Sequence, residues 1–357
     1  MADGILPRQA IEALIRDGAI RADEAILPDQ LQPASLDLRL GRKAFRIRAS
    51  FLPAAGEAIA DKVDYVTLHT IDLSEGAVLE TGCVYLVPLM EELALPADIA
   101  ASTNPKSSTG RLDIFTRVIA DGVGGFDSAP AGFHGALAVE ISPRTFPILV
   151  RAGSRLGQIR FRRGDARLDD AALTALHAQS PVAVPQARIQ DGLNLTIDLQ
   201  SRGGPVGYRA KRHTALIDVD RRDALKMADF WDPITSSDGR LILDPDEFYI
   251  LMSREAVTIP PAYAAEMVPF DPLVGEFRVH YAGFFDPGFG HGRDVSARAV
   301  LEVRSREVPF ILEHGQVVAR LAYERMAELP DVLYGSDLKS NYQAQGLKLS
   351  KHFEPLA

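Results

Sequence analysis

The feature that most constrains the fold of this chain is a repeat of its own sequence. Segments of the first half recur in the second half in the same order. Matched pairs 162 residues apart are Glu140 and Glu302, Pro147 and Pro309, and Gly153 and Gly315; upstream, Tyr85 and Tyr249 match, as do Pro96 and Pro260 and, earlier still, Asp37 and Asp198. An alternative explanation for these matches is that β proteins in general use the same residues in their turns. A common order at a nearly constant spacing favours two copies of one fold, produced by an internal duplication.

The pattern within each copy is typical of short β-strands. Alternating runs such as LDLRLG, VYLVPL, ALAVEIS and QIRFRR are separated by Gly, Pro and Asp. Such runs predict a sandwich or barrel. Helical spacing occurs over residues 7–17 and again around residues 169–178, and the segment SPVAVPQ that follows is a plausible linker. We therefore expect an all-β protein with a few short helices and domains over residues 1–180 and 181–357.

Composition limits the partners that this chain can have. The formal net charge is -9, and no block of Lys or Arg stands out, which argues against binding duplex nucleic acid through its phosphates. A local basic pocket for a small polyanion is still compatible with this charge. No stretch approaches the roughly 20 apolar residues of a membrane span, and the N-terminus lacks the apolar core of a signal peptide. We expect a cytoplasmic protein that binds neither nucleic acid nor a membrane.

Two segments carry candidate chemistry. The run NPKSSTGRLD, residues 104–113, offers hydroxyls, backbone donors and two cations, which suit phosphate oxygens or a polarised water, although such runs are usually solvated loops. In the run ALAVEIS, alternation places Glu140 on one face with Ala136 and Ala138. A carboxylate on a buried face has a perturbed pKa and can act as a general base, whereas a solvent-facing glutamate is the commoner case.

Together these motifs resemble those of the dCTP deaminase family, part of the dUTPase-like superfamily. The segments LQPASLDLRLG, KSSTGR, FDSAPAGFHG, AVEIS and PILVRAGSRLGQIRF follow the order of the family's motifs, and SNYQAQGLKLSKHF resembles its Tyr-Gln-x-Gln-Gly tail. The resemblance touches nearly the whole chain. It implies two tandem dUTPase-like domains, each a distorted β-barrel or jelly roll. It also implies hydrolysis of dCTP to dUTP and ammonia, and a homo-oligomer with a trimeric arrangement of folds.

The resemblance also implies roles for individual residues. Glu140 matches the catalytic glutamate, Ser107 would hold the attacking water, and Arg111 would orient the site. The implied substrate-binding residues are Lys106, Ser108, Asp127, Gln158, Tyr342 and Gln345. The H-x-E and P-C-x-x-C pattern of zinc deaminases is absent, and Cys83 is the single cysteine. We therefore expect no zinc and no protein metal site, with Mg²⁺ held by the nucleotide phosphates.

The second copy departs from the family's pattern. It has no Ser-Ser-x-x-Arg segment, but it keeps Asp286 and Glu302 and adds His280. We expect one working site per chain, centred on Glu140. The second copy would supply wall residues near Asp286 or His280. Glu302 would have a structural or supporting role, such as pairing with Arg304 or Arg306 at a domain interface.

Two other functions stay open at this point. One is a dUTP pyrophosphatase, or a bifunctional enzyme that converts dCTP to dUMP; the tail YQAQGLKLSKHF is not Gly-rich, and the strand carries Glu rather than Asp, which argues against it. The other is a non-catalytic nucleotide-binding protein, because half of the chain has lost its motif. The joint presence of Ser107, Arg111 and Glu140 argues against that alternative.

Overall fold

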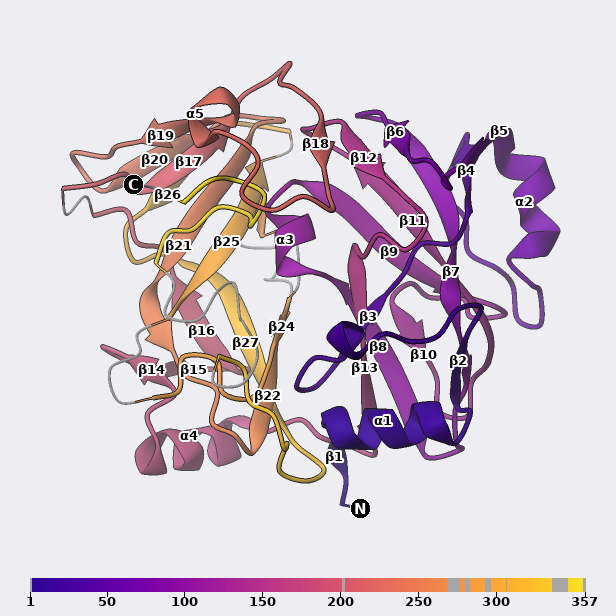
Figure 1. The fold of residues 1–357 in the computed structure, drawn as a ribbon. Coiled ribbons are helices and arrows are strands. Elements are labelled where there is room, and N and C mark those ends of the chain that lie inside the picture. Colours follow the sequence, from indigo (N-terminus) through magenta and orange to yellow (C-terminus); the bar gives the residue numbers. More distant parts are fainter. Residues whose placement is uncertain are drawn as a thin grey trace.

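The chain forms two β domains that lie side by side, with the short helix α3 (Ser107–Gly110) between them (Figure 1). The computed structural model describes residues 2–200, 203–268, 277–279, 283–292, 297–305, 307–335 and 346–355. Within these residues strands predominate and helices are short, which confirms the expected all-β class. No helix in this part of the chain is long and apolar enough to cross a membrane.

The first domain precedes the linking helix α4 (Asp170–Gln179). Besides α3, its elements are β1 (Gly4–Ile5), α1 (Arg8–Arg16), β2 (Ile20–Ala22), the 3-10 helix η1 (Pro28–Gln30), β3 (Leu36–Leu38), β4 (Lys43–Ile47), α2 (Ala60–Val66), β5 (Thr67–Asp72), β6 (Ala77–Leu79), β7 (Val84–Ala94), β8 (Ile99–Pro105), β9 (Ile114–Ala120), β10 (Ser128–Ala129), β11 (His134–Pro143), β12 (Ile148–Val150) and β13 (Gly157–Arg163). The expected helix over residues 7–17 is α1, whose Ile11 and Leu14 are buried in the core.

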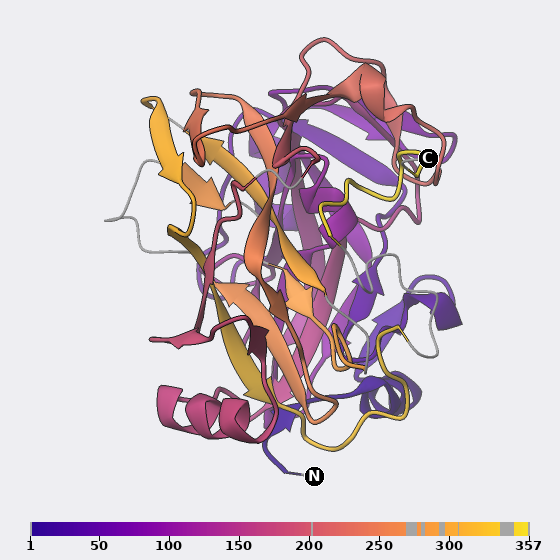
Figure 2. The same cartoon turned by 90° about the vertical axis from the view of Figure 1, so that its left-hand side faces the viewer.

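The second domain follows α4, which lies at the same end of the molecule as the N-terminus (Figures 1 and 2). Its elements are β14 (Ala183–Val184), β15 (Arg188–Ile189), β16 (Leu193–Thr196), β17 (Gly207–Ala210), β18 (Ile217–Asp218), α5 (Met227–Phe230), β19 (Trp231–Ile234), β20 (Arg240–Leu243), β21 (Phe248–Val257), β22 (Tyr263–Val268), β23 (Phe277–Val279), β24 (Phe284–Phe285), β25 (Arg298–Ser305), β26 (Phe310–Glu313) and β27 (Val317–Arg325).

The order of strands is the same in both domains, which confirms the internal duplication. One sheet runs β5-β4-β7-β11-β9 in the first domain and β19-β17-β21-β25-β23 in the second. The opposing sheet joins β3 to β13, β8 and β10, and its counterpart joins β16 to β27, β22 and β24. Each pair of sheets encloses apolar side chains, as expected for a closed β architecture.

One connection differs between the two copies and shapes the rest of the molecule. In the first domain, residues 48–66 join β4 to β5 and contain α2, which lies on the side of that domain away from the second (Figure 1). In the second domain, residues 211–230 join β17 to β19. There β18 reaches the first domain and pairs in parallel with β12, with Ile217 opposite Ile148. The two domains are therefore tied by a shared sheet.

Side chains from both domains also share one apolar core at the boundary. The Trp231 ring packs edge-on against Phe146 of the first domain, with 5.5 Å between ring centroids, and against Phe353 near the C-terminus at 6.0 Å. Buried Arg160 of β13 donates to the Ala265 carbonyl at 3.0 Å and to Asp286 at 3.1 Å, both in the second domain. Because these groups lose their water at the boundary, the domains are expected to unfold together.

A buried ion pair crosses the boundary beside α3. Arg304 of β25 donates to the carboxylate of Asp113, which also accepts a 2.5 Å hydrogen bond from the Thr145 hydroxyl. Asp113 is 1% exposed and has a left-handed φ of 56°. Since a short polar side chain tolerates that conformation, Asp113 both ends the α3 turn and anchors β25.

We predict that Arg304→Met lowers the free energy of unfolding by about 3–5 kcal/mol, because it leaves the Asp113 carboxylate buried without its cation. Urea unfolding followed by Trp231 fluorescence measures this change. The matched control is Arg240→Met, which breaks the exposed Arg240–Glu313 pair and should cost less than about 1 kcal/mol. A loss in Arg304→Met no larger than in the control would contradict the assignment.

Candidate active site

A cavity of about 610 Å³ opens between the two domains, next to α3. The first domain lines it with polar residues, among them Lys106, Ser107, Ser108, Arg111, Arg155 and Gln158. The second domain adds apolar and aromatic residues, including Met267, Phe284, Phe285, Phe289, Val300 and Tyr334, together with Asp286 and Glu302. The cavity therefore has one wall from each copy of the fold.

The Ser-Ser-x-x-Arg segment forms a single tight turn at the floor of this cavity. Lys106 begins the turn in extended conformation, and its carbonyl accepts hydrogen bonds from the amides of Thr109 and Gly110. The Thr109 hydroxyl donates to the Leu156 carbonyl at 2.8 Å, which ties the turn to the loop before β13. These bonds hold the turn so that Ser107 and Arg111 both line the cavity.

The second domain places a carboxylate, that of Glu302, beside this turn. Its Oε1 lies 3.8 Å from Nε of Arg111, and both side chains are buried. Glu302 sits on β25 opposite Ile250 of β21 and lines the cavity. Burial raises the pKa of Glu302 to about 7, while the Arg111 guanidinium acts in the opposite direction by stabilising the ionised form. Arg304 pairs with Asp113, so it is not the partner of Glu302 that the sequence suggested, and the alternative partner, Arg306, lies outside the described residues.

Glu140 lies elsewhere, and within the chain the fold does not bring it to Ser107 and Arg111. It occupies the position on β11 that Glu302 occupies on β25, opposite Leu86 and Arg117. Its neighbours form a separate apolar cluster that includes Ile59, Val66, Leu86, Ile119 and Ala138, with Phe51 and Phe126 packed against it. Burial raises the pKa of Glu140, and a hydrogen bond with Ser50 opposes that rise. The connection that contains α2 thus covers this carboxylate.

The equivalent sheet face of the second domain has a different cover. Tyr208, Phe248, Ile250 and Val300 belong to the same core cluster as Leu112 of the first domain. Glu302 consequently faces the Ser-Ser-x-x-Arg turn, whereas Glu140 faces its own domain's connection. This difference in covering segments explains why one carboxylate meets the polar turn and the other does not.

Asp127 and Asp286, the aspartates of the matching turns in the two copies, also differ in whether they line the cavity. Asp127 accepts a 3.0 Å hydrogen bond from the Thr103 hydroxyl and a 2.8 Å bond from the Val118 amide, and it does not line the cavity. Burial raises its pKa to about 6. Asp286 does line the cavity, as the sequence predicted for the second copy, and it accepts from Arg160. His280 lies outside the described residues.

Lys106 and Gln158 lie on the first-domain wall beside the buried Asp37 of the DLRLG segment. The Lys106 ammonium donates to the Asp37 carboxylate, and the Ser35 hydroxyl donates to the Gln158 side chain at 3.2 Å. β13 pairs with β3 so that Gln158 is opposite Asp37. Both predicted binding residues are therefore held by neighbours from the same motif.

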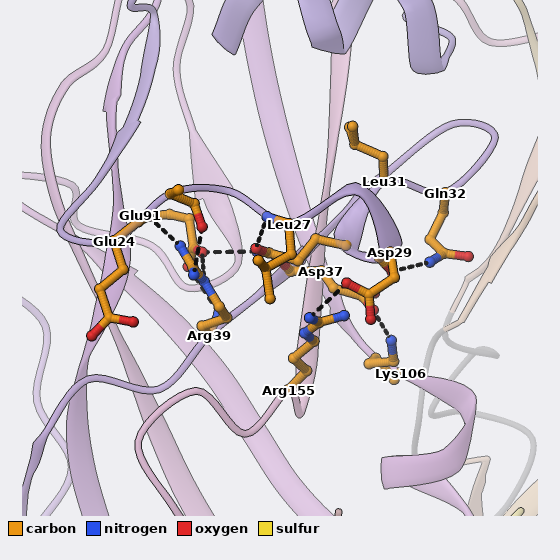
Figure 3. Close-up of polar contacts among 12 residues, drawn as sticks. Glu24, Leu27, Asp29, Leu31, Gln32, Asp37, Arg39, Glu91, Lys106 and Arg155 are labelled. Carbon is orange, nitrogen blue, oxygen red and sulfur yellow. Dashed lines mark hydrogen bonds and ion pairs between the residues drawn. The ribbon is translucent and has the colours of Figure 1, made fainter. Parts of the chain in front are cut away.

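A buried ion pair supports this wall from behind. Arg39 donates to Glu91 through Nε at 2.8 Å and through its backbone amide at 2.8 Å, and Gln30 donates to the same carboxylate at 2.9 Å. Figure 3 shows Arg39 and Glu91 on the left and Lys106 and Arg155 lower and further right; Lys106 and Arg155 line the cavity. Because the pair is buried and fully hydrogen-bonded, it fixes the path of the segment before β3.

The C-terminal segment that the structure describes, residues 346–355, runs along the cavity and binds the α3 turn. The Lys348 carbonyl accepts a 3.0 Å hydrogen bond from Arg111, and the Ser350 hydroxyl donates to the Ser108 carbonyl at 2.8 Å. The predicted tail residues Tyr342 and Gln345 lie outside the described residues. The segment that follows them positions Arg111, a function that the sequence motif does not reveal.

Metal ligands are grouped nowhere in the described part of the chain: no cluster of three or more His, Cys, Asp or Glu residues there could hold an ion. The expected Mg²⁺ needs no such cluster, because it would be carried by phosphate oxygens.

The fold and the cavity define a two-domain β protein with a polyanion-compatible site shared between its domains. Family models agree with this description. Residues 2–165 match the N-terminal domain of 2'-deoxycytidine 5'-triphosphate deaminase, and residues 169–353 match its C-terminal domain. The chain belongs to the dCTP deaminase family.

Solved and curated relatives support the same family. A crystal structure of 2'-deoxycytidine 5'-triphosphate deaminase from Agrobacterium tumefaciens is 59% identical with a TM-score of 0.88, covering 91% of this chain and 100% of that one. A Methanoculleus marisnigri protein named "dCTP deaminase, dUMP-forming" is 35% identical over 45% of this chain and 81% of its own length. A "dCTP deaminase" from Halorubrum lacusprofundi is 33% identical over 37% of this chain, and the match spans 63% of that relative.

Proposed function

We propose that this chain hydrolyses dCTP to dUTP and ammonia at a single site between its two domains. The observation that carries the proposal is the meeting of Glu302 with Arg111 and Ser107 in the interdomain cavity. A single glutamate on a strand does not by itself indicate a catalytic function. A buried glutamate with a raised pKa, an arginine and a serine at one end of a cavity has the groups that hydrolytic deamination requires.

The two walls of the cavity suit the two ends of the nucleotide. The aromatic and apolar side chains of the second domain, among them Phe284 and Val300, would pack against the cytosine and the sugar. Lys106 and Gln158 would meet the phosphates, with Ser108 beside them. Asp286 would accept a hydrogen bond from a sugar hydroxyl. Mg²⁺ would neutralise phosphate charge, and its ligands would be phosphate oxygens and water.

Glu302 would carry the protons in this reaction. It takes one proton from a water held by the Ser107 hydroxyl and passes it to ring N3, while the water oxygen bonds to C4. It then takes the proton of the new C4 hydroxyl and delivers it to the amino group, so that ammonia leaves and C4 becomes a carbonyl. A pKa of about 7 lets one carboxyl accept and return protons near neutral pH. Arg111 stabilises the ionised carboxylate at the start.

The carboxylates at the phosphate end favour dUTP as the product. Formation of dUMP requires a second activated water near the α-phosphate. Asp29 is paired with Arg155 at 3.0 Å, which lowers its pKa, and Asp37 is paired with Lys106. A carboxylate that is ion-paired with a cation is a poor base. The competing outcome is dUMP, the product named for the Methanoculleus relative.

We predict that incubation with dCTP and Mg²⁺ releases ammonia and dUTP in equal amounts and no pyrophosphate. Enzymatic ammonia and pyrophosphate assays on the same sample measure both. Pyrophosphate in step with ammonia would replace dUTP by dUMP as the product. Absence of ammonia under all conditions would contradict the deaminase proposal.

We predict opposite results from two equivalent glutamate variants. Glu302→Gln keeps the shape of the site but removes the proton carrier, and kcat should fall by about 10²–10⁴-fold. Glu140→Gln serves as the matched control, since Glu140 has the same strand position but lies under the α2 connection, and its kcat should stay within about threefold of the wild type. If Glu140→Gln abolishes turnover and Glu302→Gln does not, the earlier assignment to Glu140 is right.

We predict that kcat/KM falls as the pH drops below about 7. Burial raises the pKa of Glu302 to about 7, and only the ionised carboxylate can take a proton from water. Activity is therefore present above this pH and is lost, with a slope of one, as the carboxylate becomes protonated. A pH profile of kcat/KM with stability checked at each pH tests this, and a profile that is flat between about pH 5 and 8 would contradict it.

A further inference from the structure

A single arginine of the first domain holds three consecutive residues of the second-domain wall of the cavity. Arg160 is 1% exposed and does not itself line the cavity. Its Cζ lies 4.1 Å from the centre of the Phe284 ring, and its Nη2 donates to the Phe285 carbonyl at 3.3 Å and to Oδ1 of Asp286 at 3.1 Å. All three of these residues line the cavity. One buried side chain therefore fixes a ring, a carbonyl and a carboxylate of the same wall.

The wall needs this support because its own strand is very short. β24 consists of Phe284 and Phe285 and pairs with two residues of β22. Strands of globular proteins usually have about 3–10 residues, so a two-residue ladder holds its side chains weakly. The Arg160 guanidinium also donates to the carbonyl of Ala265, a residue of β22, at 3.0 Å. Arg160 thus joins β24 to the neighbouring strand from the side of the first domain.

The same guanidinium balances the charge of this wall. Asp286 and Glu324 are both buried, and their carboxylates lie 3.1 and 3.6 Å from Arg160. Burial raises the pKa of Asp286, while the charge and the hydrogen bond of Arg160 oppose that rise and favour the ionised form. Because Arg160 takes Oδ1 of Asp286, Oδ2 is the oxygen that stays open to a ligand among the described residues.

The internal duplication shows that this contact is specific to one side of the boundary. The residue 162 positions after Arg160, at the spacing of the repeat, is Ala322, whose side chain is too short to reach across. The position of Asp286 is occupied in the first copy by Pro130, which follows Asp127: in both turns the carbonyl at this position accepts a 3.1 Å hydrogen bond from the amide three residues later. The arginine and the aspartate therefore each occur in one copy, and they meet beside the cavity.

We propose that Arg160 is a positioning residue for the sugar, which holds Asp286 so that Oδ2 accepts the 3'-hydroxyl of a bound 2'-deoxynucleotide. This inference rests on the proposed function for the contact between Asp286 and a sugar hydroxyl. In a 2'-deoxynucleoside 5'-triphosphate the 3'-hydroxyl is the one free hydroxyl of the sugar. A carboxylate that is fixed before binding loses little conformational freedom on binding, so its hydrogen bond contributes more affinity. Arg160 does not line the cavity, so it acts through Asp286.

The test is calorimetric binding of two nucleotides to the full chain with Mg²⁺. One is α,β-imido-dUTP, which can be neither deaminated nor cleaved at the α-phosphate, and the other is its 3'-deoxy counterpart. The wild type should bind the first about tenfold or more tighter, as expected for a hydrogen bond to a charged group. Arg160→Met should bring this ratio to within about twofold of one, while affinity for the 3'-deoxy nucleotide stays within about threefold. Arg160→Lys keeps the cation but not the planar fork, so its ratio should fall between the two.

The matched control is Arg163→Met on the same strand, since Arg163 pairs with Asp98 of its own domain at 2.6 Å and does not line the cavity. Its ratio should equal that of the wild type. A wild-type ratio in Arg160→Met, or equal weakening of both nucleotides as a merely structural role would give, would overturn the proposal. If Arg160→Met does not fold, a wild-type ratio in Arg160→Lys overturns it.

The two proposals can fail separately in this experiment. Binding is measured without turnover, so a chain whose ratio depends on Arg160 but which releases no ammonia from dCTP would refute the proposed function and leave the role of Arg160 standing. A wild type that binds both nucleotides equally, or neither, would overturn the role of Arg160 whatever its activity on dCTP.

Discussion

The candidate site depends on one arrangement of charges across the domain boundary. Arg111 of the first domain faces Glu302 of the second, and two residues further along each chain segment the charges are exchanged, with Asp113 facing Arg304. The two pairs align β25 with the α3 turn. All four side chains are buried, so neither domain can present its half of the site without the other. The chemistry that we propose is thus a property of the paired domains.

Divergence of one connection accounts for the asymmetry between the copies. Residues 48–66 fold back over their own sheet and enclose Glu140, while residues 211–230 extend to the first domain, pair with β12 and carry Arg222 to the cavity. Both copies keep the strand glutamate. Only in the second copy does the strand glutamate meet the Ser-Ser-x-x-Arg turn, and this restricts the site to one per chain in our account.

Much of this structure is predictable from the sequence. The all-β class and the duplication follow from alternation and from residue pairs at a fixed spacing, and Ser107, Ser108, Arg111, Lys106 and Gln158 do line one cavity. The pairing of Glu302 with Arg111 was not predicted, because alternation places a glutamate on a face without saying what covers that face. The clue was that the second copy keeps its glutamate without a Ser-Ser-x-x-Arg segment. Arg222 belongs to no motif, so only the three-dimensional fold places it at the cavity.

A crystal structure of the Glu302→Gln variant with dCTP and Mg²⁺ tests the central claim most directly, because the variant should bind the nucleotide without consuming it. Our account predicts cytosine in the interdomain cavity, with its C4 amino group and N3 within hydrogen-bond distance of residue 302 and a water on Ser107. Cytosine bound beside Glu140, or in the cavity without contact to residue 302, would contradict it.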